Sequence, residues 1–333
     1  MTANYFHPLQ AGILGTGSYL PEKILSNQEL EKLVDTSDEW IKTRTGIHER
    51  RIAKQNEQTS DMAVEAARKA VKAAKIDLKQ IDAIINATIT PDVPWPATAC
   101  LIQKKLGVQK AFALDVSAAC SGFLYGLTLA QGLIVTKTAK KVLVIGADKL
   151  SAITNYKDRN TCILFGDGAG AVVVGTTHRR GRIAASSLGT DGEGFEKLIQ
   201  PAGGTRLPAS QATLAEGKHF LEMDGKEVFK NAIKRMVESS GVVLRRAGSS
   251  AEEVALFIPH QANLRIIEEV AERMKIPTEK VYLTIQKYGN TSSASIPIAL
   301  DEAFAQGRIK LGDKVLLSSF GAGFTWGSIL IDW

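Results

Sequence analysis

The sequence is poor in the residues that bind metals, form disulfides or stack on nucleic-acid bases. Its 333 residues include three cysteines, with no Cys-x-x-Cys pair, and five histidines that stand far apart along the chain. We therefore expect no structural or catalytic metal. A small, odd number of cysteines is typical of a reducing compartment, most simply the cytoplasm. Aromatic residues make up only 6% of the chain and do not alternate with its basic clusters, which argues against nucleic-acid binding.

Long apolar runs are also lacking. The longest apolar stretches, such as 171–175 and 296–300, are far too short to span a bilayer, so we expect no membrane insertion. Residues 1–10 show no basic segment followed by an apolar one, which argues against a secretory signal. The formal net charge of +6 fits an acidic protein or ligand, nucleic acid or an anionic membrane, but it could equally serve solubility.

Strand-like and helix-like segments alternate along the chain. Residues 81–90 and 141–146 are apolar and β-branched, which predicts strands. Residues 61–75 repeat apolar side chains at helical spacing, with Ser60 placed to cap the helix. A second helix is expected to begin near Ser37, where acidic residues follow a capping hydroxyl. This alternation predicts a layered α/β fold.

Three short motifs recur in the same order in the two halves of the chain. Ala-Gln-Gly at 130–132, Lys-Val-Leu at 141–143 and Gly-Ala-Gly at 168–170 return at 305–307, 314–316 and 321–323. Each half therefore reads as helix, strand, glycine-rich turn and strand. The recurrence favours an internal duplication, with halves at residues 1–180 and 181–333.

Two polar residues follow short apolar strands. Strand 111–116 runs into Cys120, strand 254–258 runs into His260, and a helix follows each of them. We interpret the two segments as equivalent parts of the duplication. Strand ends of this kind are where open α/β sheets place their sites, so Cys120 and His260 are expected to face each other.

Taken singly, these residues allow ordinary structural interpretations. A lone cysteine such as Cys120 is most often a small buried side chain. At a helix start, however, the helix dipole favours a thiolate, and the small neighbours leave room for an acyl group. His260 could simply cap a helix, and Asn290 could simply occupy a turn.

Motifs over nearly the whole chain match one family in that family's order. They are Gly15–Pro21, Asp35–Trp40, Arg44–Gly46, Ala118–Phe123, Phe165–Gly170, Pro259–Asn263, Gly289–Ser292 and Phe320–Gly327. In these motifs the chain resembles β-ketoacyl–acyl carrier protein synthase III, of the thiolase superfamily. The resemblance implies a thiolase-like five-layered αβαβα fold built from two duplicated halves. It also implies a cytoplasmic enzyme that is usually a homodimer.

The resemblance implies an acyltransferase that performs a decarboxylating Claisen condensation. A short acyl-CoA, with acetyl-CoA as the expected primer, reacts with malonyl–acyl carrier protein to give 3-ketoacyl–acyl carrier protein, CoA and CO2, which initiates type II fatty acid synthesis. Cys120 would accept the acyl group, and His260 and Asn290 would donate hydrogen bonds to the malonyl thioester carbonyl. The backbone N–H groups of Cys120 and Ala322 would form the oxyanion hole, although many relatives have glycine in place of Ala322. No cofactor is expected, because the CoA thioester is the substrate.

The resemblance also implies binding residues. Four residues are expected to bind CoA: Thr36, Trp40, Arg44 and Arg159. Of these, Trp40 and Arg159 would stack on either side of the adenine. Three basic residues are expected to contact the acidic carrier protein: Lys230, Arg265 and Arg273. Trp95 would reach into the acyl pocket of a partner subunit. A helix start, a surface salt bridge and a solvated basic face are the structural alternatives for these residues.

Related enzymes differ in one further catalytic group. Non-decarboxylating thiolases need a second cysteine near the C-terminal glycine turn, and no cysteine follows Cys162. Relatives of hydroxymethylglutaryl-CoA synthase use a glutamate, and none lies between Glu65 and Glu193. Elongating synthases carry a second histidine in place of Asn290. Plant-type polyketide synthases share the Cys-His-Asn set, and a catalytically silent CoA-binding module on the same fold is the alternative from another class.

Overall fold

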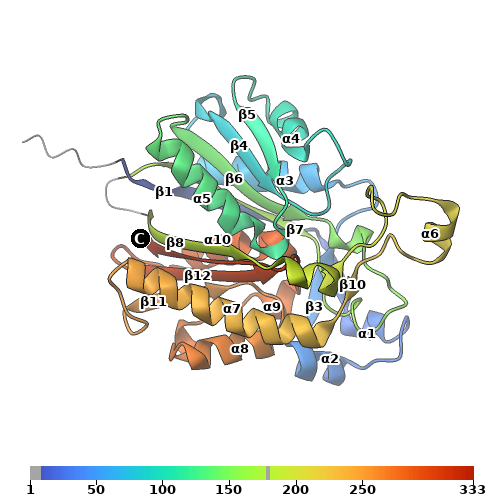
Figure 1. Cartoon of the computed structure of the whole chain (residues 1–333). Coiled ribbons are helices and arrows are strands. Elements are labelled where there is room, and N and C mark those ends of the chain that lie inside the picture. Colours follow the sequence, from blue (N-terminus) through green and yellow to red (C-terminus); the bar gives the residue numbers. More distant parts are fainter. Residues whose placement is uncertain (1–8, 178–180) are drawn as a thin grey trace, which may run out of the picture.

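The computed structural model describes residues 9–177 and 181–333 (Figure 1). Within them, the main sheet is mixed and has nine strands. Their order across the sheet is β11 (Val254–Pro259), β12 (Lys314–Gly321), β13 (Thr325–Asp332), β8 (Arg182–Thr190), β1 (Ala11–Tyr19), β7 (Gly168–Thr176), β6 (Lys141–Asp148), β4 (Ala83–Ala87) and β5 (Phe112–Val116). β1 and β8 are joined only at the pair Gly12–Arg182, so the sheet consists of two parts with a narrow junction.

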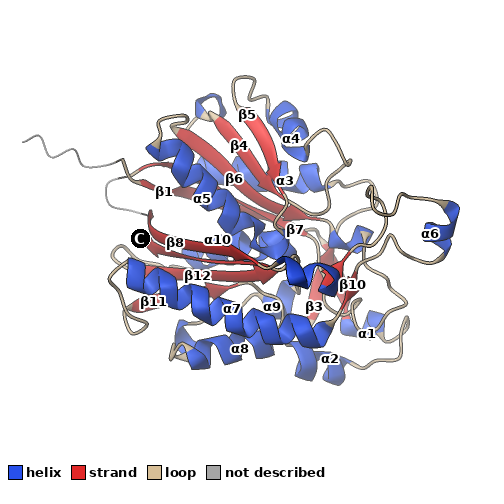
Figure 2. Cartoon of the chain, viewed as in Figure 1, coloured by secondary structure: helices blue, strands red, loops and turns tan. Residues whose placement is uncertain are grey.

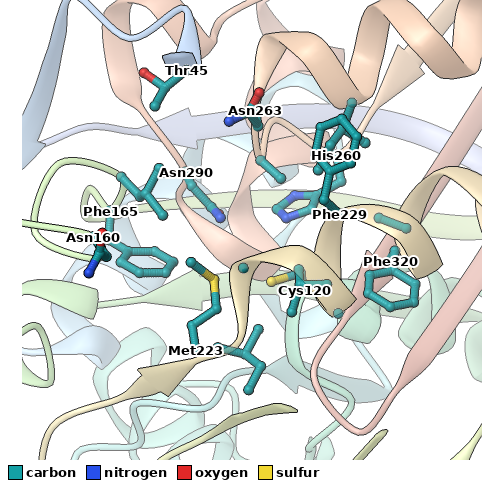
Figure 3. A pocket seen from close by; sticks show the side chains of 18 of the residues that line it. Thr45, Cys120, Asn160, Phe165, Met223, Phe229, His260, Asn263, Asn290 and Phe320 are labelled. Carbon is teal, nitrogen blue, oxygen red and sulfur yellow. The ribbon is translucent and has the colours of Figure 1, made fainter. Parts of the chain in front are cut away.

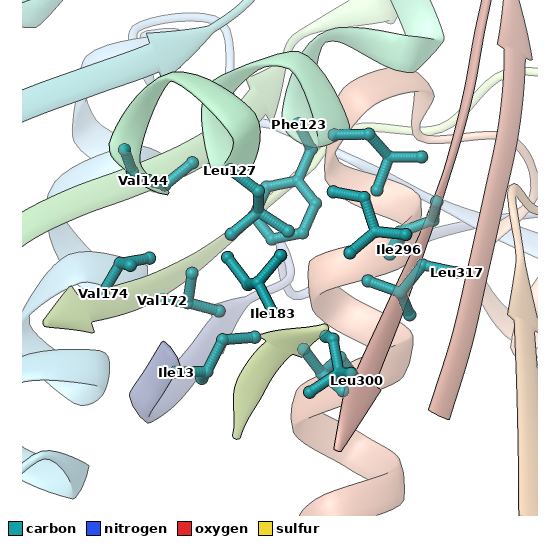
Figure 4. Close-up of a cluster of buried hydrophobic side chains, with 14 of the residues drawn as sticks. Ile13, Phe123, Leu127, Val144, Val172, Val174, Ile183, Ile296, Leu300 and Leu317 are labelled. Atoms are coloured by element: carbon teal, nitrogen blue, oxygen red, sulfur yellow. The ribbon is translucent and has the colours of Figure 1, made fainter. Parts of the chain in front are cut away.

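Helices cover both parts of the sheet and fill the space between them (Figure 2). α3 (Thr59–Ala73) and α4 (Thr98–Leu106) pack on one outer face, and α7 (Gly225–Arg246) and α8 (Leu264–Arg273) pack on the other. α5 (Gly122–Val135) and α10 (Ser295–Ala305) lie between the two parts, where their apolar side chains meet residues of both (Figure 4). The result is the expected αβαβα arrangement of five layers.

The local sequence explains why these segments form these elements. β6 and β7 are apolar on both faces because helices cover both sides of them. α5 approaches β6 closely at Gly126, where a Cβ atom would lie 2.9 Å from a methyl of Val144. α2 (Asp38–Thr45) begins as predicted, with the Ser37 side chain accepting a hydrogen bond from a backbone N–H. The cap predicted at Ser60 is wrong, because α3 begins two residues earlier, with Gln58 at the cap position, and the Ser60 hydroxyl instead donates to Asp92.

Two of the three recurring motifs fall on matching elements, and the glycine motif does not, because residues 168–170 begin β7 whereas residues 321–323 are the end of β12 and the turn after it. The end of α5, then β6, then β7 corresponds to the end of α10, then β12, then β13. In both halves the strand of the second motif pairs in antiparallel fashion with the next strand along the chain, which is β7 in the first half and β13 in the second. The predicted division into residues 1–180 and 181–333 stays a prediction, since both sets of strands share one sheet and one layer of helices.

The predicted equivalence of the Cys120 and His260 segments is wrong. β11, which precedes His260, lies parallel to β12 just as β4 lies parallel to β6, so β11 corresponds to β4 and not to β5. The counterpart of the Cys120 segment is instead the short 3-10 turn Ser292–Ala294 before α10, as Ala119–Ser121 is before α5. Ala119 and Ser292 both have left-handed backbones, with φ values of 46° and 50°. Cys120 therefore matches Ser293.

Smaller elements gather at the end of the molecule where α5 and α10 begin. They are β2 (Lys23–Ser26), α1 (Asn27–Leu30), β3 (Glu49–Ile52), β9 (Leu198–Ile199), α6 (Gln211–Ala215), β10 (Glu222–Met223) and α9 (Ile285–Tyr288). Further 3-10 turns occupy Leu78–Gln80, Leu150–Ala152, Gly192–Lys197 and Thr278–Lys280. In the described part of the chain, no helix is both long enough and apolar enough to cross a membrane.

Candidate active site

Cys120, His260 and Asn290 lie around one cavity of about 250 Å³ (Figure 3). They come from three separate segments: the turn before α5, the loop after β11 and the turn after α9. Their exposed fractions are 8%, 3% and 7%, so each side chain meets little besides protein and this cavity. The fold thus brings together the three residues expected to carry the chemistry.

The backbone around Cys120 is fixed by contacts with the C-terminal hairpin of β12 and β13. The Ser319 hydroxyl donates to the Cys120 carbonyl oxygen at 2.9 Å, and the Thr325 hydroxyl donates to the Ala118 carbonyl oxygen at 2.9 Å. Gly321 approaches so closely that a Cβ atom there would lie 2.7 Å from the Cys120 nitrogen. The glycine at the end of β12 is therefore required by this close approach, and the nucleophile segment depends on residues about 200 positions away.

Burial dominates the chemistry of the Cys120 thiol. It raises the pKa of Cys120 to about 12, while the nearby Ser292 hydroxyl and the Cys120 backbone N–H act in the opposite direction, and Asp148 raises the pKa further. Burial thus opposes the thiolate that the helix start is predicted to favour. Within the described residues, the buried Ser292 oxygen has no hydrogen-bond partner of ordinary geometry.

His260 is held as a neutral imidazole. Burial lowers its pKa to about 3. Its backbone N–H donates to the Ser318 carbonyl oxygen at 2.8 Å, and its Nδ1 lies 2.7 Å from the Ser295 Oγ. The neighbouring Gln261 is fully buried, and its side chain accepts hydrogen bonds from the backbone N–H groups of residues 284 and 285. The loop after β11 is thereby locked, and the free edge of the imidazole ring faces the cavity (Figure 3).

Asn290 is anchored through its backbone and through one end of its amide. Its N–H donates to the Leu164 carbonyl oxygen at 2.9 Å, and its Oδ1 accepts from the Ser292 N–H at 2.8 Å. Gly289, just before it, has a φ of 63°, and a Cβ atom there would lie 2.7 Å from the Leu164 oxygen. With Oδ1 occupied, the amide turns its NH2 group toward the cavity.

Asp148 is a structural residue of the site that the sequence did not reveal. Its fully buried carboxylate accepts hydrogen bonds from Thr88, Ile89, Thr90 and Ser293, at 2.8 to 3.2 Å. Burial raises its pKa, and these hydrogen bonds oppose the rise. The only sequence signal is an acid at the end of the apolar strand β6. Asp148 ties the segments after β4 and before α10 together directly beneath the cavity.

Arg50 is a second residue of this kind. It is fully buried, and its guanidinium donates to the carbonyl oxygens of Leu25 and Ile163 and to the Asn27 side chain, at 3.1, 2.7 and 2.8 Å. Residues 163–165 line the cavity, and Leu164 anchors Asn290. Arg50 therefore fixes the wall on which Asn290 depends.

A second cavity, of about 170 Å³, opens on the other side of Cys120. Its walls are mostly apolar: Ile89, Leu150, Ile153, Phe165, Leu198 and Leu221. Ala322 also lines it, and Ala322 is not among the described residues with a left-handed backbone, whereas Gly323 is, with a φ of 130°. Alanine is therefore tolerated at 322 without strain. Cys120 thus lines both cavities: the outer cavity, which it shares with His260 and Asn290, and the apolar cavity, whose walls are mostly aliphatic.

Comparison with known proteins identifies the family. Residues 114–192 match the family model for 3-oxoacyl-[acyl-carrier-protein] synthase III, and residues 244–333 match the model for its C-terminal part. The β-ketoacyl-[acyl-carrier-protein] synthase III of Caldanaerobacter subterraneus is 54% identical over 98% of both chains. The chain belongs to the β-ketoacyl–acyl carrier protein synthase III family. It is an acyltransferase of fatty acid biosynthesis.

Other members give the same result. The family's enzyme from Clostridioides difficile is 51% identical over 97% of this chain and 98% of its own length. The crystal structure of the Aquifex aeolicus synthase III superposes with a TM-score of 0.90 at 49% identity, over 97% of this chain and all of the other. The predicted thiolase-like fold is thereby confirmed.

The residues expected to bind CoA lie near the mouth of the outer cavity. Trp40 and Arg44 line it, whereas Thr36 and Arg159 lie outside its walls. The Arg159 guanidinium stacks directly on the Trp40 ring, 4.5 Å from its centroid, and lies 3.6 Å from a carboxylate oxygen of Asp35. An adenine between them would need about 7 Å, twice a van der Waals separation, so Arg159 has to move before the base can enter.

The three predicted carrier-protein residues are exposed on α7 and α8. The Arg265 guanidinium lies over the ring of Phe229, which lines the outer cavity, at 5.5 Å from the ring centroid. Arg273 is paired with Glu269 at 2.6 Å, whereas Lys230 and Arg265 form no ion pair within the described residues.

Trp95 is 83% exposed and lines neither cavity of its own chain, so only a second subunit could use it as an acyl-pocket residue. Over residues 9–177 and 181–333, no three metal-ligating side chains come together.

The raised pKa of Cys120 predicts how it reacts with an alkylating agent. Because the thiolate is the reactive form, the rate of carbamidomethylation of Cys120 by iodoacetamide should rise roughly tenfold per pH unit from about pH 7 to pH 10. The rate is measured by mass spectrometry of the Cys120 peptide in a Cys100→Ser background, which removes the exposed thiol. A plateau near the ordinary cysteine pKa would contradict the dominance of burial.

Proposed function

We propose that Cys120 carries the acyl group and that His260 and Asn290 act on the malonyl substrate. The family's reaction condenses an acyl-CoA with malonyl–acyl carrier protein and initiates type II fatty acid synthesis. The observation that carries the assignment is the position of Cys120 between two cavities, with both polar side chains on the outer one. The thioester of each substrate can thus approach Cys120 from outside while its acyl group is held within.

In the first half-reaction, the Cys120 sulfur attacks the acyl-CoA carbonyl and the CoA thiol leaves. The thiol proton passes to the departing CoA sulfur, so no net charge remains in the buried site. The backbone N–H groups of Cys120 and Ala322 are the proposed donors to the tetrahedral oxyanion. The close approach of Gly321 to the Cys120 nitrogen supports this pairing, since it brings the hairpin turn next to that N–H.

In the second half-reaction, malonyl–acyl carrier protein loses CO2, and the electron pair of the broken bond forms an enolate on the thioester carbonyl. His260 and Asn290 stabilise that oxygen by donating hydrogen bonds, which gain strength as its charge develops. The enolate carbon then attacks the Cys120 thioester, and the cysteine sulfur leaves. Decarboxylation supplies the carbanion, so no strong base is needed.

The two half-reactions can be separated by substitution. Cys120→Ala should abolish the acyl adduct but spare part of the decarboxylation of malonyl–acyl carrier protein, because His260 and Asn290 remain. Asn290→Ala should keep the adduct and slow decarboxylation by about 100-fold or more, as expected when one donor to an oxyanion is removed. Intact-mass spectra measure the adduct, and labelled CO2 release measures decarboxylation. Loss of the adduct in Asn290→Ala would overturn the assignment.

The apolar cavity next to Cys120 supports primers larger than acetyl. Its volume of about 170 Å³ exceeds that of an apolar cavity of about 150 Å³ that is known to hold benzene, so an acyl chain of about six carbons would fit as well as acetyl. We propose that the enzyme accepts acetyl-CoA and also branched or straight primers up to this size.

A panel of acyl-CoAs tests this range by the rate of Cys120 acylation. Wild type should accept acetyl, isobutyryl and hexanoyl primers. Leu221→Phe, which fills part of the cavity wall, should lose the hexanoyl primer while keeping the acetyl primer. Wild-type acylation by acetyl-CoA alone would rule out a roomy pocket.

Exposed apolar residues support pairing with a second copy of the chain. Trp95 is 83% exposed, Val93 is 47% exposed, and Phe112 is 42% exposed on β5, which is the edge strand of the sheet. Contact through this edge would cover them together. Trp95 would then be available to the other subunit's acyl pocket and would limit its depth.

The charge pattern on α7 and α8 supports a docking surface for the acidic carrier protein. Arg265→Glu should raise KM for malonyl–acyl carrier protein about tenfold or more and weaken its dependence on salt, because an unpaired charge next to the cavity is reversed. Arg273→Glu is the matched comparison on the same helix and should cost less, since Glu269 already pairs with Arg273. Steady-state kinetics at two ionic strengths check this, and equal effects would contradict the proposed centre of the patch.

A further inference from the structure

His260 and Asn290 can each present either a donor or an acceptor to the cavity. A neutral imidazole has one N–H and one bare nitrogen, and an amide has an NH2 group at one end and an oxygen at the other. The proposed chemistry needs donors from both. What holds the acceptor atom of each side chain away from the cavity therefore decides whether the site can stabilise an enolate.

In Asn290, a backbone N–H group holds the acceptor oxygen of the side chain away from the cavity. The Ser292 N–H donates to the Asn290 Oδ1 at 2.8 Å, which leaves the NH2 group for the cavity. Ser292 opens the 3-10 turn that leads directly into α10.

For His260 the corresponding group is a hydroxyl at the first residue of α10. The Ser295 Oγ lies 2.7 Å from the His260 Nδ1, and both residues are buried. The same oxygen accepts a hydrogen bond from the Gln261 N–H at 3.4 Å. Within the described residues, Nδ1 is the acceptor within reach of the single proton on that hydroxyl, and accepting it leaves the ring proton on Nε2.

We propose that Ser295 is a positioning residue that fixes His260 in the Nε2–H tautomer, so that the first residue of α10 and the turn just before it set the direction of both hydrogen-bond donors. The proposal rests on the proposed function for its catalytic meaning, but the tautomer itself is a property of the free enzyme. One consequence is that Nε2 cannot take the Cys120 proton. His260 then serves the malonyl substrate alone.

The N-terminus of α10 would also help to stabilise the enolate. A helix start carries a partial positive charge, and here it lies beside the two side chains that would contact the enolate oxygen. The start of α10 and the turn before it thus supply both the orientation of the donors and part of the charge that the enolate needs. α5 has the same relation to Cys120 in the other half-reaction.

Nitrogen-15 NMR of histidine-labelled enzyme tests the tautomer directly. In wild type, long-range ring correlations of His260 should show a protonated Nε2 and a bare, hydrogen-bonded Nδ1, with the signal assigned by its absence in His260→Gln. Ser295→Ala should give a mixture of tautomers, whereas Ser295→Thr, which keeps the hydroxyl, should retain the wild-type pattern. Ser293→Ala, a buried hydroxyl of the same segment that contacts Asp148 instead, is the matched control and should leave the His260 signal unchanged.

Activity measurements on the same variants distinguish the role proposed for Ser295 from the function proposed for His260. Ser295→Ala should slow malonyl decarboxylation by about 10- to 100-fold, as is typical when the partner of a functional histidine is removed. Acylation of Cys120 should stay within about twofold of wild type, and Ser295→Thr should restore decarboxylation. A protonated Nδ1 in wild type, or an unchanged tautomer in Ser295→Ala, would overturn the role of Ser295. A changed tautomer with full decarboxylation would uphold that role and overturn the function proposed for His260.

Discussion

The site depends on the burial of two helices in the middle layer of the molecule. α5 and α10 lie between the two parts of the sheet, and the turns that precede them are held in left-handed conformations at Ala119 and Ser292. Because both helices pack against both parts of the sheet, their first residues cannot shift without disturbing the core. That rigidity is transmitted to Cys120 on one side and to Ser292 and Ser295 on the other.

The two helix starts are connected to each other and to the rest of the fold by buried polar contacts. Asp148 accepts hydrogen bonds from the segment after β4 and from Ser293, and Ser319 holds the Cys120 carbonyl. Each contact joins residues far apart in sequence. The geometry of Cys120, His260 and Asn290 is thus a property of the whole chain, and no short segment could reproduce it.

The sequence predicted well what depends on local pattern and on recognisable motifs. The layers, most strands and the three residues Cys120, His260 and Asn290 could be predicted because apolar periodicity and motif order are local information. The wrong match between the Cys120 and His260 segments also arose from relying on local sequence pattern. Every strand that runs into a helix has a similar local pattern, so only the pairing of β11 with β12 distinguishes a counterpart of β4 from a counterpart of β5. Asp148 and Arg50 were missed because their roles rest on partners that folding alone brings near.

A buried thiol also determines how the enzyme withstands oxidants. Peroxides convert a thiolate to sulfenic acid far more readily than a thiol, and further oxidation is irreversible. Because burial raises the pKa of Cys120, it favours the thiol, which is the less oxidisable form of the residue. The same desolvation that packs the start of α5 into the core thus also protects this cysteine from oxidation.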